Sequence, residues 1–233
     1  MSKPALSIDD LTPEQLQRLQ ARMAALRAEA PAAEGIPRRT DDGPAPLSFA
    51  QQQIWLQHQL DPAGTLFNVP TVLRLGGELD RGALRRALDE LVRRHELLRT
   101  TFELREDGPV QVVAPARGAP FTQADLAGEA DPEAVALVRA HAEAARPFDL
   151  AAEPPFRATL LRVGPRDHVL ALTMHHVARD RWSSGVLLGE LAALYRAFRE
   201  GAPSPLPEPR IRFADFAAWE RERLRGETLE RLL

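Results

Sequence analysis

A polar cluster follows an apolar, strand-like run in the second half of the chain. Two histidines, His175 and His176, come directly after residues 169–174, which read VLALTM. Asp180 follows four residues after the second histidine. Imidazole takes up and releases protons near neutral pH, and active sites form where buried strands end. The cluster therefore predicts a site in which a histidine acts as a base.

The two histidines have different tasks if the strand continues through them. Successive residues of a strand point to opposite faces, so both imidazoles cannot face one substrate. One is then available as a base, and the other holds the turn through hydrogen bonds. Asp180 either orients an imidazole or organises the loop around it. Spacing leaves open which histidine is the base and which of these tasks Asp180 has.

Other chemistries fit the cluster less well. A lone histidine is more often a satisfied core residue, but a pair beside an aspartate is less typical of a core. Adjacent side chains on opposite faces make a poor chelate, so no metal is expected. A serine hydrolase is disfavoured because the chain has no G-x-S-x-G sequence. The chain has no cysteine, which excludes thiol nucleophiles and Cys-ligated zinc.

Alternating helix and strand patterns must position this cluster. Ser48, with Gln51 three residues later, has the pattern of a helix capping box, and Asp80 is typical of a helix N-cap. We expect helices at residues 48–59, from 80, 132–145, 183–200 and from about 213. We expect strands at residues 69–75, 99–103, 110–113, 156–163 and 168–174. This order predicts an α/β fold in which helices cover a mixed sheet.

The first 43 residues differ from the rest. A Thr-Pro pair at residues 12–13 is typical of a helix start, and an Ala/Pro-rich stretch follows at residues 30–37. Between them, four apolar residues recur at helical spacing: Leu16, Leu19, Met23 and Leu26. This pattern predicts an N-terminal helix and linker. The helix either packs on the following domain or docks another chain.

Composition sets the broad class of the protein. The 233 residues carry a net charge of −3 and are 44% hydrophobic, which is typical of a globular protein and not of a charge-based nucleic-acid binder. No apolar run is long enough to span a bilayer, and the N-terminus lacks a signal-peptide pattern. We therefore expect a soluble, cytoplasmic protein without nucleic-acid or membrane partners.

Four segments together resemble the condensation domains of nonribosomal peptide synthetases. Residues 175–183, HHVARDRWS, resemble that family's HHxxxDG motif. The others, in chain order, are similar to its SxAQxxxW, RHExLRTxF and YxDYAxW motifs: SFAQQQIW (48–55), RHELLRTTF (94–102) and FADFAAW (213–219). The resemblance covers residues 44–233. The segment 1–43 stays outside it and is a possible docking element.

The resemblance implies a fold, a reaction and partners. The fold is like that of chloramphenicol acetyltransferase, with two lobes and a tunnel between them. Donor and acceptor peptidyl carrier proteins, beside neighbouring synthetase domains, bring substrates on phosphopantetheine arms, and no cofactor is bound directly. The acceptor amine attacks the donor thioester and an amide forms. His176 is the catalytic residue implied, beside His175, while Asp180 is structural and pairs with Arg94. Arg99 of the same motif supports the site.

The chain departs from the family in two respects. Arg181 stands where the family has glycine after the motif aspartate. Arg181, with Trp182 and Ser183, is expected beside the tunnel and its substrates, or Arg181 turns to solvent. A full condensation domain is roughly twice as long as this chain. We therefore expect only the N-terminal lobe in this chain, with weak or no activity by itself.

Two other functions remain open from the sequence. One is a noncatalytic relative that docks carriers or recruits a partner enzyme; the intact His175 and His176 argue against it, whereas Arg181 keeps it open. The other is an epimerisation domain, which shares the histidine motif. A heterocyclisation domain is disfavoured because it has aspartate where His175 and His176 stand.

Overall fold

The computed structural model of the chain describes residues 35–224. One compact unit begins at Ile36 and holds all the helices and strands of these residues. The helix expected within residues 12–29 lies outside the described residues. Part of the expected linker lies within them, and there the backbone N–H of Arg39 donates to Asp215 Oδ1 at 3.0 Å. Across the described residues, no helix combines the length and apolar character needed to cross a bilayer.

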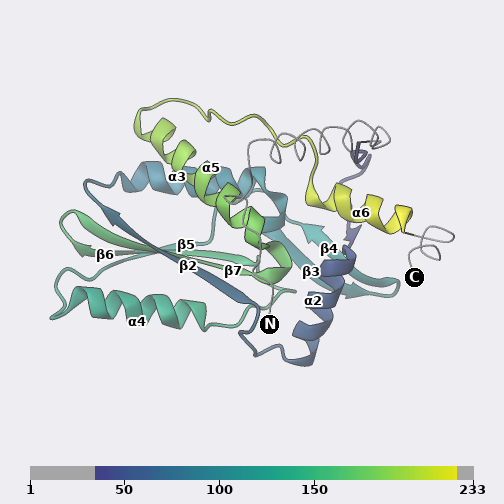
Figure 1. Ribbon diagram of the computed structural model, residues 1–233, viewed down its shortest axis with the longest axis horizontal. Coiled ribbons are helices and arrows are strands. Elements are labelled where there is room, and N and C mark those ends of the chain that lie inside the picture. Colours follow the sequence, from purple (N-terminus) through teal and green to yellow (C-terminus); the bar gives the residue numbers. More distant parts are fainter. Residues whose placement is uncertain (1–34, 225–233) are drawn as a thin grey trace, which may run out of the picture. The chain divides into compact units, whose positions relative to one another are not determined.

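A four-stranded sheet forms the middle of this unit (Figure 1). Its strands are β2 (Asn68–Gly76), β5 (Phe121–Asp125), β6 (Phe156–Gly164) and β7 (Asp167–His175). The strand order is β2–β7–β6–β5. β7 is antiparallel to both of its neighbours, whereas β5 runs parallel to β6. The sheet is therefore mixed, as the sequence predicts.

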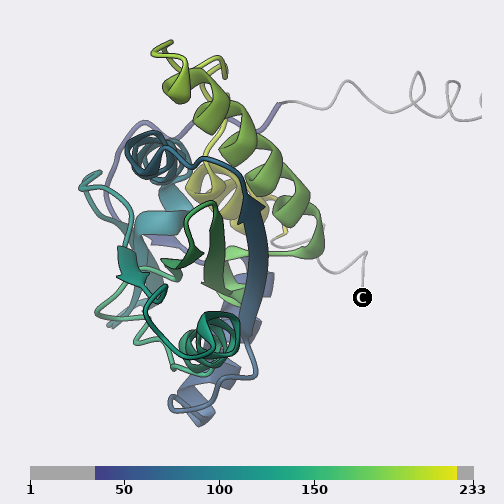
Figure 2. The same cartoon turned by 90° about the vertical axis from the view of Figure 1, so that its left-hand side faces the viewer.

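Three helices cover the two faces of this sheet: α3 (Arg81–Arg94), α4 (Pro132–Ala144) and α5 (Arg181–Arg199). Figures 1 and 2 together show α3 and α5 on one face and α4 on the other. Alternation along β7 explains the two layers. Leu170 and Leu172 belong to the core that α3 and α5 cover, whereas Val169 packs with Ala136 of α4. Odd-numbered residues of β7 therefore face α4.

A smaller sheet lies beside the first, with strand order β1–β4–β3. Its strands are β1 (Ala45–Pro46), β3 (Thr100–Arg105) and β4 (Gly108–Val113). Gly108 follows the tight turn between β3 and β4 with a φ of 117°, a conformation that favours glycine. Two further helices lie at this end of the unit (Figure 1), α2 (Phe49–Leu60) and α6 (Phe213–Arg223).

The structure confirms the expected helices and strands from residue 48 onward. The Ser48–Gln51 capping box forms, with hydrogen bonds of 3.0 and 3.1 Å. α5 begins at Arg181, before the expected residue 183, because Asp180 is its N-cap. The sequence did not predict β1 or β5. β1 is only two residues long, and the middle of β5 is polar and exposed, so neither has the apolar alternation that indicates a strand.

Candidate active site

The two motif histidines separate at the end of β7. His175 is the last residue of the strand, and His176 begins a short 3-10 turn, η3 (His176–Ala178). The side chain of His175 faces the α4 side of the sheet and is only 2% exposed, whereas His176 is exposed. The backbone N–H of His176 donates to the carbonyl of Phe67 at 2.8 Å. The chain therefore presents one imidazole to solvent and keeps the other inside.

His175 is enclosed by rings and acts as an acceptor. Its Nδ1 accepts a hydrogen bond from the backbone N–H of Val177 at 3.2 Å. The rings of His58, Phe67 and Phe148 lie 5.1, 5.7 and 6.0 Å away, centroid to centroid. Burial, helped by the nearby imidazoles of His58 and His176, lowers the pKa of His175 to about 3. The neutral ring can therefore hold the η3 turn on which His176 stands.

Asp180 organises the start of α5. Its carboxylate accepts from the backbone N–H of Ser183 at 2.7 Å, and its own N–H donates to Ser183 Oγ at 2.9 Å. These reciprocal bonds are a capping box, and the carboxylate lies at the positive end of the helix dipole. Of the two tasks that the sequence left open, this geometry favours organising the loop.

Arg179 joins the motif segment to the rest of the sheet. Its guanidinium donates to the carbonyl of Val69 and to Thr71 Oγ1 on β2, each at 3.0 Å. Its Nε donates to Ser184 Oγ in α5 at 2.7 Å. One side chain thus ties the η3–α5 connection to the strand next to β7. No pattern in the sequence predicted this task for Arg179.

Arg94 does not form the ion pair expected with Asp180. It is the last residue of α3, and its guanidinium lies 3.4 Å from the carboxylate of Glu190 in α5. It also donates to the carbonyl of Pro207 at 2.8 Å. The expected pairing is wrong because Arg94 faces the middle of α5, whereas Asp180 caps that helix at its first turn. Arg94 therefore fixes α5 to α3.

Glu190 is the other half of this contact, and the motifs did not predict it. Besides Arg94, it contacts His95, whose Nε2 lies 2.7 Å from Glu190 Oε2. Burial acts to raise the pKa of Glu190, but hydrogen bonds from His95 and Arg94 outweigh it and hold the pKa below its ordinary value. A signal existed in the sequence: Glu190 shares the helix stripe of Leu187, Leu191 and Leu194, where an acid needs a partner.

The remaining expected site residues lie apart from the histidines or only partly within the described residues. Arg99 donates to the carbonyl of Ala114 and lies 3.4 Å from Glu96, so it braces the short 3-10 helix η2 (Glu96–Arg99) against the end of β4. The backbone of Arg181 and Trp182 begins α5, but their side chains lie outside the described part of the chain.

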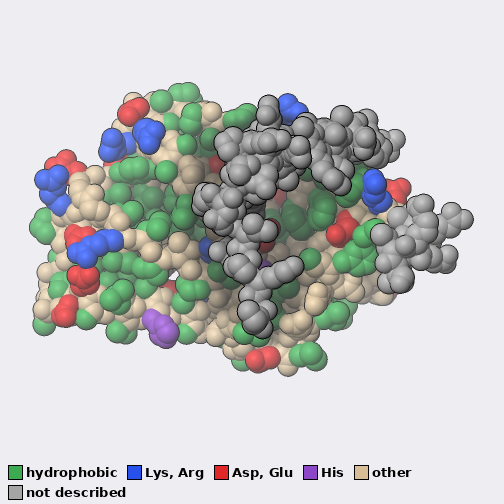
Figure 3. Space-filling view, in the orientation of Figure 1, with side chains coloured by type: hydrophobic (Ala, Val, Ile, Leu, Met, Phe, Trp, Pro, Cys, Tyr) green, Lys and Arg blue, Asp and Glu red, His purple; other side chains and the backbone are tan. Residues whose placement is uncertain are grey.

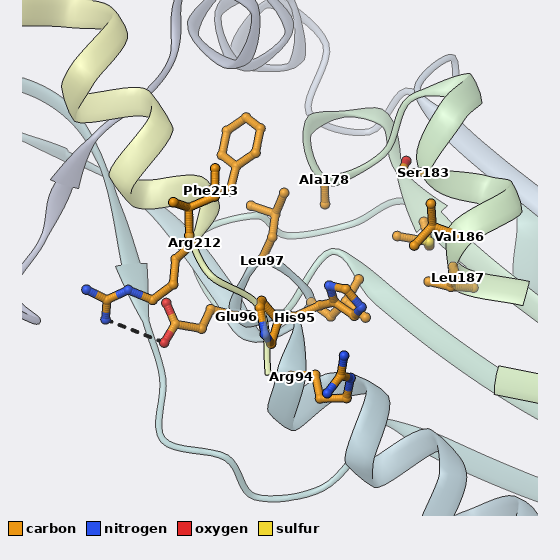
Figure 4. A pocket seen from close by; sticks show the side chains of 14 residues that line it. Arg94, His95, Glu96, Leu97, Ala178, Ser183, Val186, Leu187, Arg212 and Phe213 are labelled. Carbon is orange, nitrogen blue, oxygen red and sulfur yellow. Dashed lines mark ion pairs between the residues drawn. The ribbon is translucent and has the colours of Figure 1, made fainter. Parts of the chain in front are cut away.

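An apolar pocket of about 210 Å³ opens next to the motif segment. Met174 is one of its lining residues. Because Met174 and His175 point to opposite faces of β7, the pocket lies on the opposite side of the strand from His175. Figure 4 shows α5 on one side and Arg212 with Phe213 on the other. Its apolar lining comes from Leu97, Leu98, Met174, Ala178, Val186, Leu187, Ile211 and Phe213. Such a pocket fits an apolar group better than a charged one.

Polar groups line both sides of the pocket. Ser183 lines it from the first turn of α5, and Glu96 lies 3.7 Å from Arg212 in the ion pair drawn in Figure 4. On the face shown in Figure 3, basic and acidic side chains lie next to one another toward the edges of the view, with hydrophobic side chains between these groups. Within the described residues, no group of three or more His, Asp or Glu side chains is placed to hold a metal ion.

The comparisons with known proteins agree on one family. A family model described as a condensation domain matches residues 42–232. The chain is 45% identical over 190 residues to Chondramide synthase cmdD of Chondromyces crocatus, which covers 81% of this chain and 5% of that protein. It is 42% identical over 226 residues to Phosphinothricin tripeptide synthetase PhsC of Streptomyces viridochromogenes, covering 96% and 21%.

Solved structures agree with these sequence matches. The first condensation domain of the calcium-dependent antibiotic synthetase, in complex with a substrate analogue, matches with a TM-score of 0.70 and 29% identity. The match covers 81% of this chain and 45% of that one. The starter condensation domain of rhizomide synthetase RzmA matches in fold, with a TM-score of 0.72 and 24% identity over 78% and 44% of the chains. The chain thus spans less than half of each of these two solved domains.

Proposed function

The chain belongs to the condensation-domain family of nonribosomal peptide synthetases, and on that premise we propose that it helps to form an amide between two carrier-bound substrates. The donor is an acyl or peptidyl thioester, and the acceptor is the amine of an aminoacyl thioester. Both arrive on the phosphopantetheine arms of carrier proteins, so these arms are parts of the substrates. Family membership supports the reaction class.

One observation carries the assignment of the base: of the two motif histidines, His176 alone is exposed. His175 is buried with its Nδ1 engaged, and its lowered pKa makes it a poor proton acceptor for a substrate. His176 stands on a turn fixed by Phe67 and by His175 through Val177. We assign His176 as the group that positions the amine or accepts its proton, with His175 as support.

The proposed step balances without any further reactant. The acceptor nitrogen attacks the thioester carbonyl carbon, a C–N bond forms and the C–S bond breaks. The amine proton passes to the imidazole of His176 and then to the departing thiolate, which leaves as the donor arm's thiol. Because both substrates are tethered, proximity contributes much of the rate, and one modest base is enough.

The apolar pocket offers a place for a nonpolar group of a substrate. Two of its lining residues, Ala178 and Ser183, follow His176 by two and seven positions in the chain. We propose that it receives the apolar part of one substrate while the reacting atoms lie near His176. Because the chain spans less than half of the two solved condensation domains, we assign the complete activity to a longer protein.

The test uses the intact synthetase that contains this chain, with both carriers loaded. His176→Ala should lower the rate of amide formation by about 100-fold or more, the scale of a lost general base. The measurement is the amount of condensed product on the acceptor carrier, followed by mass spectrometry. His141→Ala is the matched control, because His141 is exposed on α4 and far along the chain from the motif.

Other outcomes separate the competing functions. Undiminished condensation by His176→Ala would contradict the proposal. Carrier binding that is kept in His176→Ala, with no amide formed by the unaltered protein, would indicate a carrier-docking relative. Inversion at the donor α-carbon without amide formation would indicate an epimerisation domain.

A further inference from the structure

Arg157 is a buried cation near the start of β6, an inner strand of the four-stranded sheet. It lies on β6, paired in register with Thr173 of β7, and is only 5% exposed. Strand alternation puts Arg157, Thr173 and His175 on the same α4-facing side of the sheet. Arg157 is therefore a near neighbour of the buried motif histidine across the β6–β7 pair.

The partners of this guanidinium are neutral. Its Nη2 donates to the carbonyl of Arg146 at 2.6 Å, and its Cζ lies 3.7 Å from the ring centroid of Phe148. In the part of the chain that the structure describes, its Nε and Nη1 have no hydrogen-bond partner. Burial lowers the pKa of Arg157. A buried cation held by a carbonyl and a ring costs stability, which calls for a local task.

The groups that Arg157 holds lead directly to His175. Phe148 packs against the His175 ring in a T-shaped arrangement, with centroids 6.0 Å apart and planes at 83°. The same connection after α4 is held from the other neighbouring strand, where Asn68 Nδ2 donates to the carbonyls of Ala144 and Arg146 at 2.7 and 2.9 Å. Asn68 is opposite His175 in the β2–β7 register. Side chains from both strands that flank β7 therefore fix the segment that encloses His175.

We propose that Arg157 is a positioning residue for the histidine pair: it presses Phe148 against His175 and so fixes the turn that carries His176. His175 transmits the effect because its Nδ1 accepts the N–H of Val177 inside η3. A shift of about 1 Å in a reacting group can cost about 100-fold in rate. The task of orienting His176 in catalysis rests on the proposed function, whereas the placement of His175 does not.

The first test is kinetic and uses the intact synthetase. Arg157→Met keeps the length and apolar stem but removes the guanidinium, and should lower kcat about tenfold while KM for the carrier substrates changes less than twofold. Arg157→Lys should recover part of kcat because it restores the cation. The matched control is Arg162→Met, on the same strand, where Arg162 forms a surface ion pair with Asp125 at 2.7 Å.

A partner substitution tests the route. Phe148→Leu should lower kcat by a similar factor, and the double variant with Arg157→Met should be no slower than the slower single variant. Multiplying losses would show that Arg157 does not act through Phe148 and would overturn the proposal. Unchanged kcat in a folded Arg157→Met protein, while the unaltered synthetase makes amide, would do the same.

The second test needs no turnover, so it separates this proposal from the proposed function. Diethyl pyrocarbonate modifies accessible neutral imidazoles, and mass spectrometry gives the rate at each histidine. In Arg157→Met we expect His175 to react at least tenfold faster, with His168 unchanged. His168 is also buried on β7 but lies at its other end, so it reports general loosening. Equal acceleration at both sites, or at neither, would overturn the proposal.

Discussion

Two groups of side chains hold the motif segment from opposite faces of the four-stranded sheet, and they do so by different physics. The histidine cluster is His58, Phe67, Phe148 and His175, around the end of β7. The α3–α5 clamp is Arg94, His95 and Glu190. The first fixes the turn that carries His176, and the second fixes the helix that follows it.

The difference lies in what burial does to charge. Inside the histidine cluster burial disfavours the charged imidazolium, and at His58 it outweighs the opposite effect of Asp149 and Asp61. The pKa values of His175 and His58 are both lowered, with burial as the main cause. In the α3–α5 clamp, opposite charges compensate each other and the carboxyl stays ionised. Acid should therefore weaken the two supports in different pH ranges.

The largest expected effect is acid weakening of the histidine cluster. The folded-state pKa of His175 is about 3, below the ordinary 6.5, so the unfolded chain binds the proton more readily. Its contribution to stability is fully present above pH 6.5 and declines as the pH falls. We expect the free energy of unfolding to fall by about 2 to 3 kcal/mol between pH 7 and pH 4.5 on account of His175. Urea unfolding at both pH values measures it.

His175→Asn is the control for this effect. Asn lacks a titrating group but retains an oxygen that can accept a hydrogen bond from the Val177 N–H. The decrease in the free energy of unfolding between pH 7 and pH 4.5 should therefore be smaller in this variant. A residual loss is expected from His58, which shifts in the same direction. A variant that loses as much stability as the unaltered chain over this range would show that His175 is not the buried neutral group described.

A smaller effect is expected from breaking the α3–α5 clamp. Glu190→Gln keeps the shape but leaves the buried Arg94 without a counter-charge, which should lower the free energy of unfolding by about 2 kcal/mol at pH 7. Urea unfolding again measures it. The pKa of Glu190 is lowered, so its contribution is present above about pH 4.5 and lost below it as the carboxyl is protonated.

This variant has a clear signature if the two supports are independent. In Glu190→Gln, the decrease in the free energy of unfolding between pH 7 and pH 4.5 should be the same as in the unaltered chain. Only the further decrease below pH 4.5 should be smaller. If the variant instead showed a smaller decrease in the free energy of unfolding between pH 7 and pH 4.5, the histidine cluster and the α3–α5 clamp would be coupled.

The sequence predicted most clearly what depends on near neighbours in the chain. The capping box at Ser48 follows from local rules of helix ends, and the inward position of His175 follows from alternation along β7. The end of the strand at His175, which places His176 on the η3 turn, was not predicted. The same rules explain why Asp180, three residues before Ser183, begins α5. Family resemblance added the reaction, which no local pattern contains.

The long-range partners could not be predicted in the same way. Arg94 and Glu190 are 96 residues apart, and choosing Glu190 over Asp180 required the position at which α3 meets α5. Likewise, Phe148 reaches His175 only because the connection after α4 folds under β7. The arginine at residue 157, within an otherwise apolar strand start, indicates a buried cation. This pattern does not indicate which residues contact it.

The smallest effect is expected from a surface ion pair, and it tests whether burial is what distinguishes the α3–α5 clamp. Arg74 on β2 contacts Glu133 at 2.9 Å and Asp167 at 2.5 Å, both closer than Arg94 comes to Glu190, yet its side chain is 60% exposed. Water and salt screen such a pair, and ordering two long side chains offsets much of the attraction. Arg74→Met should therefore leave the urea midpoint at pH 7 close to that of the unaltered chain. A shift as large as that of Glu190→Gln would mean that contact distance, and not burial, decides the strength of these pairs.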